Sequence, residues 1–152
     1  MFARFVTGCI MFIAVVLTGA FPARADSDIE RHRSCVHCGM DRKAYGYSRM
    51  LVTYSDGRQV GVCSLHCALT ELKAQPDQMI SAINVADRNS HALLDVSAAF
   101  WVTGGRKRGV MSATPTWAFA NLDAALSFIR DYGGNIATWE QVLAIVRNEA
   151  GH

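Results

Sequence analysis

The longest apolar segment of the chain lies at its N-terminus. Residues 5–21 carry no charged side chain, Arg4 precedes them, and the triplet Ala23-Arg24-Ala25 follows shortly afterwards. A basic residue, an apolar run and a small-x-small site are the three parts of a secretory signal peptide. We therefore predict that residues 1–25 are a cleaved signal peptide that exports the chain to the periplasm. The alternative is an uncleaved membrane anchor, which the length of the run nearly permits.

After this segment the pattern changes from polar to alternating. Residues 26–34 are polar, and we expect them to form a flexible lead-in. Ser55-Asp56-Gly57 is a hairpin turn signal between two β-prone runs. Leu65, Leu69 and Leu72 then recur at the spacing of a helix. The elements predicted in this part are strands over residues 49–54 and 58–63, a helix over 65–74 and a strand over 80–86.

The second half of the chain repeats this order. Gly133 and Gly134 end its first long helix. The elements predicted here are strands over residues 92–96, 99–103 and 116–120, a helix over 122–132, a strand over 135–138 and a helix over 139–148. We therefore predict an α+β fold of two small ββαβ units in tandem. The first unit is residues 35–90, with the cysteine-rich segment, and the second is residues 91–152, with a C-terminal helix. The shared order makes the chain a candidate internal duplication.

Charge and motifs narrow the classes of function. The whole chain has 15 basic and 13 acidic residues, and loss of Arg4 and Arg24 with the signal leaves 13 of each. This balance gives no reason to expect a nucleic acid or an anionic membrane as partner. The one basic cluster, Arg106-Lys107-Arg108, is typical of a solvated loop. No Ser-His-Asp order, phosphate-binding glycine loop or paired-carboxylate motif stands out, so we expect a protein that is not an enzyme.

The cysteines carry the candidate chemistry. Cys9 lies within the predicted signal, which leaves Cys35, Cys38, Cys63 and Cys67. An even number of cysteines in an oxidising compartment is typical of disulfides. The C-x2-C and C-x3-C spacings are also typical of two segments that share a metal ion.

The neighbouring donors favour a soft metal. Thiolate and thioether sulfurs prefer Cu(I) to harder cations. Several further donors lie beside the cysteines or in an exposed basic loop. The predicted metal site comprises Cys38, Met40, Met111, Cys35, Cys63, Cys67 and His66, with Cu(I) as the preferred ion.

Three alternatives stay open. Four cysteines also suit structural zinc, and the chain would then be a zinc-stapled interaction module. Cys35 and Cys38 are also spaced like the attacking pair of a thiol–disulfide redox protein, although the strand followed at once by a long helix is missing. In the third alternative all four cysteines form disulfides, and there is no metal site.

Three short motifs resemble those of the NosL family. They are Cys38-Gly39-Met40, Gly109-Val110-Met111, and the segment from Phe128 to Gly133-Gly134. Members of that family are accessory proteins that deliver copper to nitrous oxide reductase. The resemblance runs from about residue 35 to residue 139 and implies a periplasmic Cu(I)-binding protein built from two ββαβ units. It also implies that Cys38, Met40 and Met111 are thiolate and thioether ligands.

The resemblance further implies a carrier that has two partners, a copper donor and a copper-receiving enzyme. Cys38 would be the anchoring thiolate, and Met40 and Met111 would be neutral, exchangeable ligands. The chain departs from the family pattern in two respects. Many members are lipoproteins, but Cys9 precedes most of the apolar run and is poorly placed for lipid attachment. The remaining cysteines add sulfur beyond the short motif, so the client enzyme and the number of ions are left open.

Overall fold

The computed structural model describes residues 27–149. The predicted signal peptide, residues 1–25, lies outside the described residues, as does the end of the chain from residue 150. In the part of the chain that is described, no helix combines the length and the apolar character needed to cross a bilayer.

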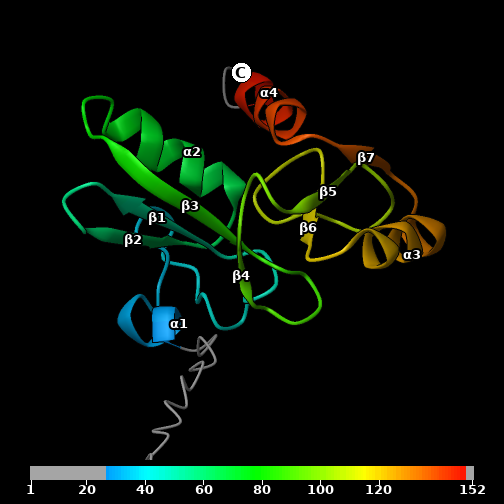
Figure 1. Cartoon of the computed structure of the whole chain (residues 1–152), viewed down its shortest axis with the longest axis horizontal. Helices are drawn as coiled ribbons and strands as arrows, with labels where there is room; N and C mark the ends of the chain where they lie inside the picture. Colours follow the sequence, from blue (N-terminus) through cyan, green and yellow to red (C-terminus); the bar gives the residue numbers. More distant parts are fainter. Residues whose placement is uncertain (1–26, 150–152) are drawn as a thin grey trace, which may run out of the picture.

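The first unit is an antiparallel sheet with one helix packed against it (Figure 1). Its strands follow the order β2-β1-β3-β4, and the helix α2 connects β2 to β3. The bounds are β1 (Met50–Tyr54), β2 (Gln59–Val62), α2 (Leu65–Ala74), β3 (Ile80–Ala86) and β4 (Leu93–Asp95).

In the described part of the chain, the second unit repeats the ββαβ order in a three-stranded sheet, which lacks a counterpart of β4. Its strands follow the order β6-β5-β7, and α3 connects β6 to β7. The bounds are β5 (Phe100–Thr103), β6 (Thr116–Phe119), α3 (Leu122–Tyr132), β7 (Asn135–Ala137) and α4 (Trp139–Glu149). In both units the first strand lies at the centre and pairs antiparallel with the second strand and with the strand after the helix. The α+β class and the repeated ββαβ order that the sequence predicted are therefore confirmed.

The boundary between the two units differs from the sequence prediction. We expected the second unit to begin at residue 91, but β4 pairs with β3 in the first sheet, with Leu94 opposite Val85. The chain reverses in a turn closed by Asp87, whose carboxylate accepts hydrogen bonds from the backbone and hydroxyl of Ser90. The first sheet therefore extends to Asp95, because strand pairing across this turn outweighs the break in the sequence pattern.

The polar segment that we expected to be a flexible lead-in contains a short helix. Ser27–Arg31 forms α1, and Asp28 is 3% exposed. Its carboxylate forms ion pairs with two fully buried arginines, Arg42 and Arg49. Polar contacts rather than apolar ones hold α1 in place, so a search for hydrophobic periodicity could not find it.

The C-terminal helix connects the two units. α4 packs against both α2 and β5. Its Val142 and Val146 are fully buried, and Trp139 at its start stacks on Trp101 of β5 with ring centroids 5.3 Å apart. Figure 1 shows α4 returning from the second unit toward α2 of the first. The main hydrophobic core therefore spans both units and lies next to the start of α2.

Candidate metal site

A tight turn presents the first pair of cysteines. We call residues Cys35–Met40 the knuckle. Its ends are closed by a backbone hydrogen bond from Cys35 N–H to the Met40 carbonyl, 2.8 Å long. Gly39 has a φ of 73°, a left-handed conformation that glycine adopts without steric cost, and its N–H donates to the Cys35 carbonyl. This closure holds Cys38 and Met40 on a short, fixed loop.

The second pair of cysteines lies at the start of a helix. Cys63 follows the last residue of β2, and Cys67 lies in the first turn of α2. Ser64 is the N-cap residue, but its side chain makes no capping hydrogen bond to the helix. Its hydroxyl instead lies 3.7 Å from the Cys63 sulfur. A thiolate at this place also benefits from the positive end of the helix dipole.

The fold brings the two pairs into one sulfur cluster. The four Sγ atoms of Cys35, Cys38, Cys63 and Cys67 all lie within 4.8 Å of one another. Cys63 is central: its sulfur lies 3.4 Å from Cys38, 3.7 Å from Cys67 and 3.9 Å from the Met40 thioether. Four thiolates about 2.3 Å from one ion would be about 3.8 Å apart, so one ion between them could reach all four.

Burial divides the cluster into an inner and an outer side. Cys35, Cys63 and Cys67 are at most 2% exposed, whereas Cys38 is exposed and Met40 is partly buried. All four cysteines are free thiols in the structure. The cluster is therefore reachable from solvent on the Cys38 side, and the inner thiols are shielded by the core.

The thiols differ in acidity. Hydrogen bonding from Cys67, and then from Cys38, Ser64 and Cys35, lowers the pKa of Cys63 to about 5 despite its burial. Burial raises the pKa of Cys38 to about 11, and the hydrogen bond to Cys63 adds to that effect. The hydrogen bond to Cys63, followed by burial, also raises the pKa of Cys67. At neutral pH Cys63 is therefore a thiolate, with the protonated thiols of Cys38 and Cys67 beside it.

A buried acid supports the knuckle from the helix side, and the sequence analysis missed it. Glu71 of α2 is 5% exposed. Its Oε2 lies 2.9 Å from His37 Nε2, and its Oε1 accepts a 2.7 Å hydrogen bond from the Tyr54 hydroxyl. Glu71 is four residues after Cys67, so both side chains lie on the buried face of α2. An acidic residue on the apolar stripe of that helix was the signal that could have revealed it.

Two of the predicted ligands are not among the four clustered thiols. His66 is adjacent to Cys67 in α2, about 100° around the helix, and it interacts electrostatically with Glu149 of α4. Met111 is 46% exposed in the loop before β6, where its φ is 58°. Their role as ligands therefore stays a prediction.

The comparisons place the chain among known proteins. Comparison with curated protein sequences finds no match. One similar solved structure is the crystal structure of the copper chaperone NosL from Shewanella denitrificans, with a TM-score of 0.55 and 19% sequence identity. The match covers 70% of this chain and 87% of that chain, which shows a shared fold. The model of the NosL family matches residues 26–145. The chain therefore belongs to the NosL family.

Proposed function

We propose that this protein is a periplasmic accessory protein that binds Cu(I) at the sulfur cluster and passes it to a copper-receiving enzyme. The observation that carries the proposal is the arrangement of three thiols and one thioether around the Cys63 sulfur, with one of these thiols open to solvent. Membership of the NosL family and the shared fold with a copper chaperone support it.

The donor set favours Cu(I) over zinc. Structural zinc sites are closed and use thiolate and imidazole ligands, whereas thioethers are typical ligands of Cu(I). Met40 lies 3.9 Å from Cys63, and the exposed Cys38 leaves one side of the cluster open. An open site also suits a carrier, because an incoming ligand can replace one donor at a time.

Burial and acidity suggest how the donors divide this work. From the sequence we expected Cys38 to be the anchoring thiolate. We now propose Cys63 for that role, because it is fully buried and its pKa is lowered to about 5. Cys38 is then the ligand that an incoming thiol displaces first. Met40 and Met111 remain the neutral ligands in this proposal.

Nitrous oxide reductase is the client that the family suggests, and the periplasm is the compartment. The family match begins at residue 26, directly after the predicted cleavage site, which supports the signal peptide. In this proposal the protein is a carrier rather than an enzyme, and copper is its cargo.

The first experiment is metal analysis of the mature chain, purified from periplasm without oxygen. We expect about one copper per chain, and Cu(I) affinity measured by competition with a chromophoric chelator should depend on the cluster. Cys63→Ser should lower affinity by more than the roughly 10- to 100-fold typical of a supporting contact, and Cys38→Ser should lower it less. Tightly bound zinc, or two disulfides and no metal, would overturn the proposal.

A matched pair of variants tests the thioethers. Met40→Leu and Met111→Leu both remove a sulfur while keeping side-chain volume, so neither should unfold the protein. We expect Met40→Leu to weaken Cu(I) binding more, because Met40 already contacts Cys63. Unchanged affinity in Met111→Leu would remove Met111 from the ligand set.

A further inference from the structure

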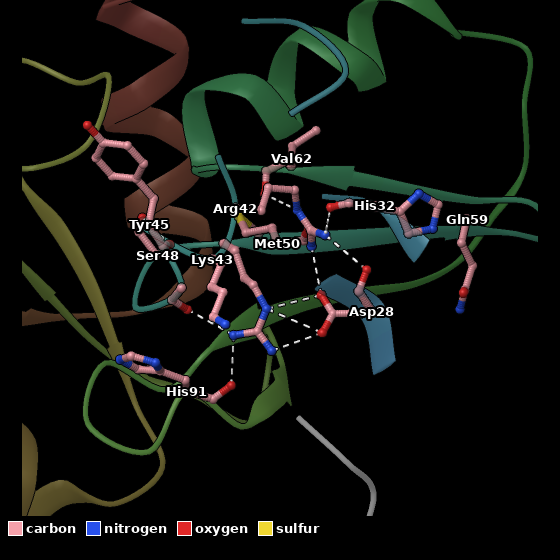
Figure 2. Close-up of polar contacts among 12 residues, drawn as sticks. Asp28, His32, Arg42, Lys43, Tyr45, Ser48, Met50, Gln59, Val62 and His91 are labelled. Carbon is pink, nitrogen blue, oxygen red and sulfur yellow. Dashed lines mark hydrogen bonds and ion pairs between the residues drawn. The ribbon is translucent and has the colours of Figure 1, made fainter. Parts of the chain in front are cut away.

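A buried charge cluster lies beneath the sulfur site. Asp28 Oδ2 is 2.7 Å from Arg42, and Asp28 Oδ1 is 2.9 Å from Arg49. Both arginines are fully buried. Figure 2 shows the Asp28 carboxylate beside the Arg42 guanidinium, with Val62 and Met50 close to that arginine. The carboxylate of Asp28 in α1 thus pairs with both buried arginines. Each arginine also donates hydrogen bonds to a different part of the fold.

The first of these arginines reaches the segments that carry the cysteines. Arg42 Nε donates to the carbonyl of Val62, 3.1 Å away, and one of its Nη atoms donates to the carbonyl of Met50 at 3.0 Å. Val62 is the residue before Cys63, and the Arg42 backbone N–H bonds to the Arg33 carbonyl just outside the knuckle. Arg42 therefore connects the base of the knuckle to the end of β2.

The second arginine has a different reach. Arg49 Nη1 donates to the carbonyls of Gly46 and His91, at 2.9 and 2.8 Å. These belong to the loops before β1 and before β4. Arg42 and Arg49 thus share burial, charge and the Asp28 partner, but they differ in the backbone that they bind.

The close approach of Arg42 to β2 has a requirement of its own. A Cβ atom at Gly61 would lie 2.7 Å from Arg42 Cζ and 2.4 Å from His32 Cβ. The Gly61 carbonyl also accepts a 3.4 Å hydrogen bond from Val36 N–H of the knuckle. Glycine at this position is what lets the knuckle and β2 lie against each other.

We infer that Arg42 is a positioning residue of the metal site: held by Asp28, it fixes the knuckle against β2 so that Cys38 and Cys63 lie 3.4 Å apart. This inference rests on the proposed function, because a positioning role presupposes a metal site. The approach of the Cys38 and Cys63 sulfurs that it explains can be measured without a bound metal. Docking of α1, which carries Asp28, is then a condition for tight metal binding.

The test compares Arg42→Lys with Arg49→Lys in the full mature chain. Both variants keep a positive charge beside Asp28 but lose hydrogen bonds that the guanidinium donates to backbone carbonyls. Both should therefore lose stability in urea unfolding to a similar degree. Two further readouts separate them. One is Cu(I) affinity, and the other is the rate at which a short bifunctional thiol reagent joins Cys38 to Cys63 in the metal-free protein, mapped by mass spectrometry.

Arg42→Lys should lower Cu(I) affinity by about 10- to 100-fold, as expected for a supporting contact, and slow the Cys38–Cys63 cross-link severalfold. Arg49→Lys should leave both within about twofold. Equal effects of the two variants, or no effect of Arg42→Lys, would overturn the inference. If Arg42→Lys does not fold, Gly61→Ala displaces the same guanidinium together with His32 while every charge is kept, and the same two losses are expected.

The two proposals fail in distinguishable ways. If the wild-type protein binds no Cu(I) but Arg42→Lys alone slows the cross-link, the positioning role stands and the proposed function fails. If Cu(I) binds tightly and both arginine variants leave the cross-link unchanged, the positioning role fails and the proposed function stands.

Discussion

At the scale of single residues, the central feature is one thiolate among protonated thiols. Cys63 receives hydrogen bonds from its neighbours, which lowers its pKa to about 5, while the pKa of Cys38 is raised to about 11. The same contacts act in both directions, because a proton shared between two sulfurs favours charge on the acceptor and disfavours it on the donor. The cluster thus offers an incoming metal one ready ligand and several that must release a proton.

This arrangement predicts how Cu(I) affinity depends on pH. Cys63 is already a thiolate near neutral pH and releases no proton when it binds metal. Cys38 must lose its proton, so apparent affinity should rise about tenfold per pH unit for each such thiol that is recruited. Competition with a Cu(I) chelator between about pH 6.5 and 8.5 measures the slope. A slope of zero would mean that Cys63 alone supplies thiolate to the metal.

At the scale of elements, the two helices that follow β2 and β6 begin in different ways. Asn121 caps α3 by accepting a hydrogen bond from Ala124 N–H, at 2.9 Å. Ser64 occupies the same position in α2, but its hydroxyl contacts the Cys63 sulfur instead of the helix. The start of α2 thus gives up a capping bond and supports the thiolate.

The two cap residues are therefore expected to respond differently to alanine. Asn121→Ala should lower the free energy of unfolding by about 1 kcal/mol, because a helix N–H loses its acceptor. Ser64→Ala should cost less stability but raise the pKa of Cys63, because the thiolate loses a donor. Urea unfolding measures the first quantity, and thiolate absorbance against pH measures the second. A larger loss of stability in Ser64→Ala than in Asn121→Ala would contradict this division.

At the scale of the whole molecule, buried carboxylates hold the parts together. Asp28 connects α1 to the first unit, and Asp87 accepts a hydrogen bond from Ala120 N–H at the entry to α3. Burial alone would raise the pKa of Asp28, but the hydrogen bonds and charges of Arg49 and Arg42 outweigh it and hold that pKa below its usual value. For Asp87, hydrogen bonds from Ser90, Ala120 and Asn89 outweigh burial in the same direction.

These shifts predict loss of stability in acid. A carboxyl whose pKa is lower in the folded state stabilises the fold above its unfolded pKa, here 3.8, and that stabilisation is lost as pH falls further. The pKa of His32 is lowered by burial and by Arg42, so a smaller decline should begin below pH 6.5. Urea midpoints measured from about pH 7.5 to 2.5 should follow this course. A midpoint that stays constant through pH 3.8 would contradict it.

Much of the fold and part of the site could be predicted because their signals are local. Helix and strand periodicity gave α2, α3 and the order of the elements along the chain, and the two cysteine pairs were recognisable from their spacing. The burial of α1 was not predictable in this way, because an Asp–Arg cluster leaves no apolar pattern. The pairing of β4 with β3 was not predictable either, because it depends on the turn at Asp87 that brings the two strands together.

What the sequence determined by itself is the list of elements and the supply of sulfur donors. Only the tertiary structure decided which donors meet, because the knuckle and the start of α2 are brought together by contacts distant in the chain. Those contacts made Cys63 the thiolate and left Cys38 exposed. The physical reason is that acidity, burial and metal-ligand geometry depend on distances between segments of the chain. A sequence pattern reports only the spacing of residues within a single segment.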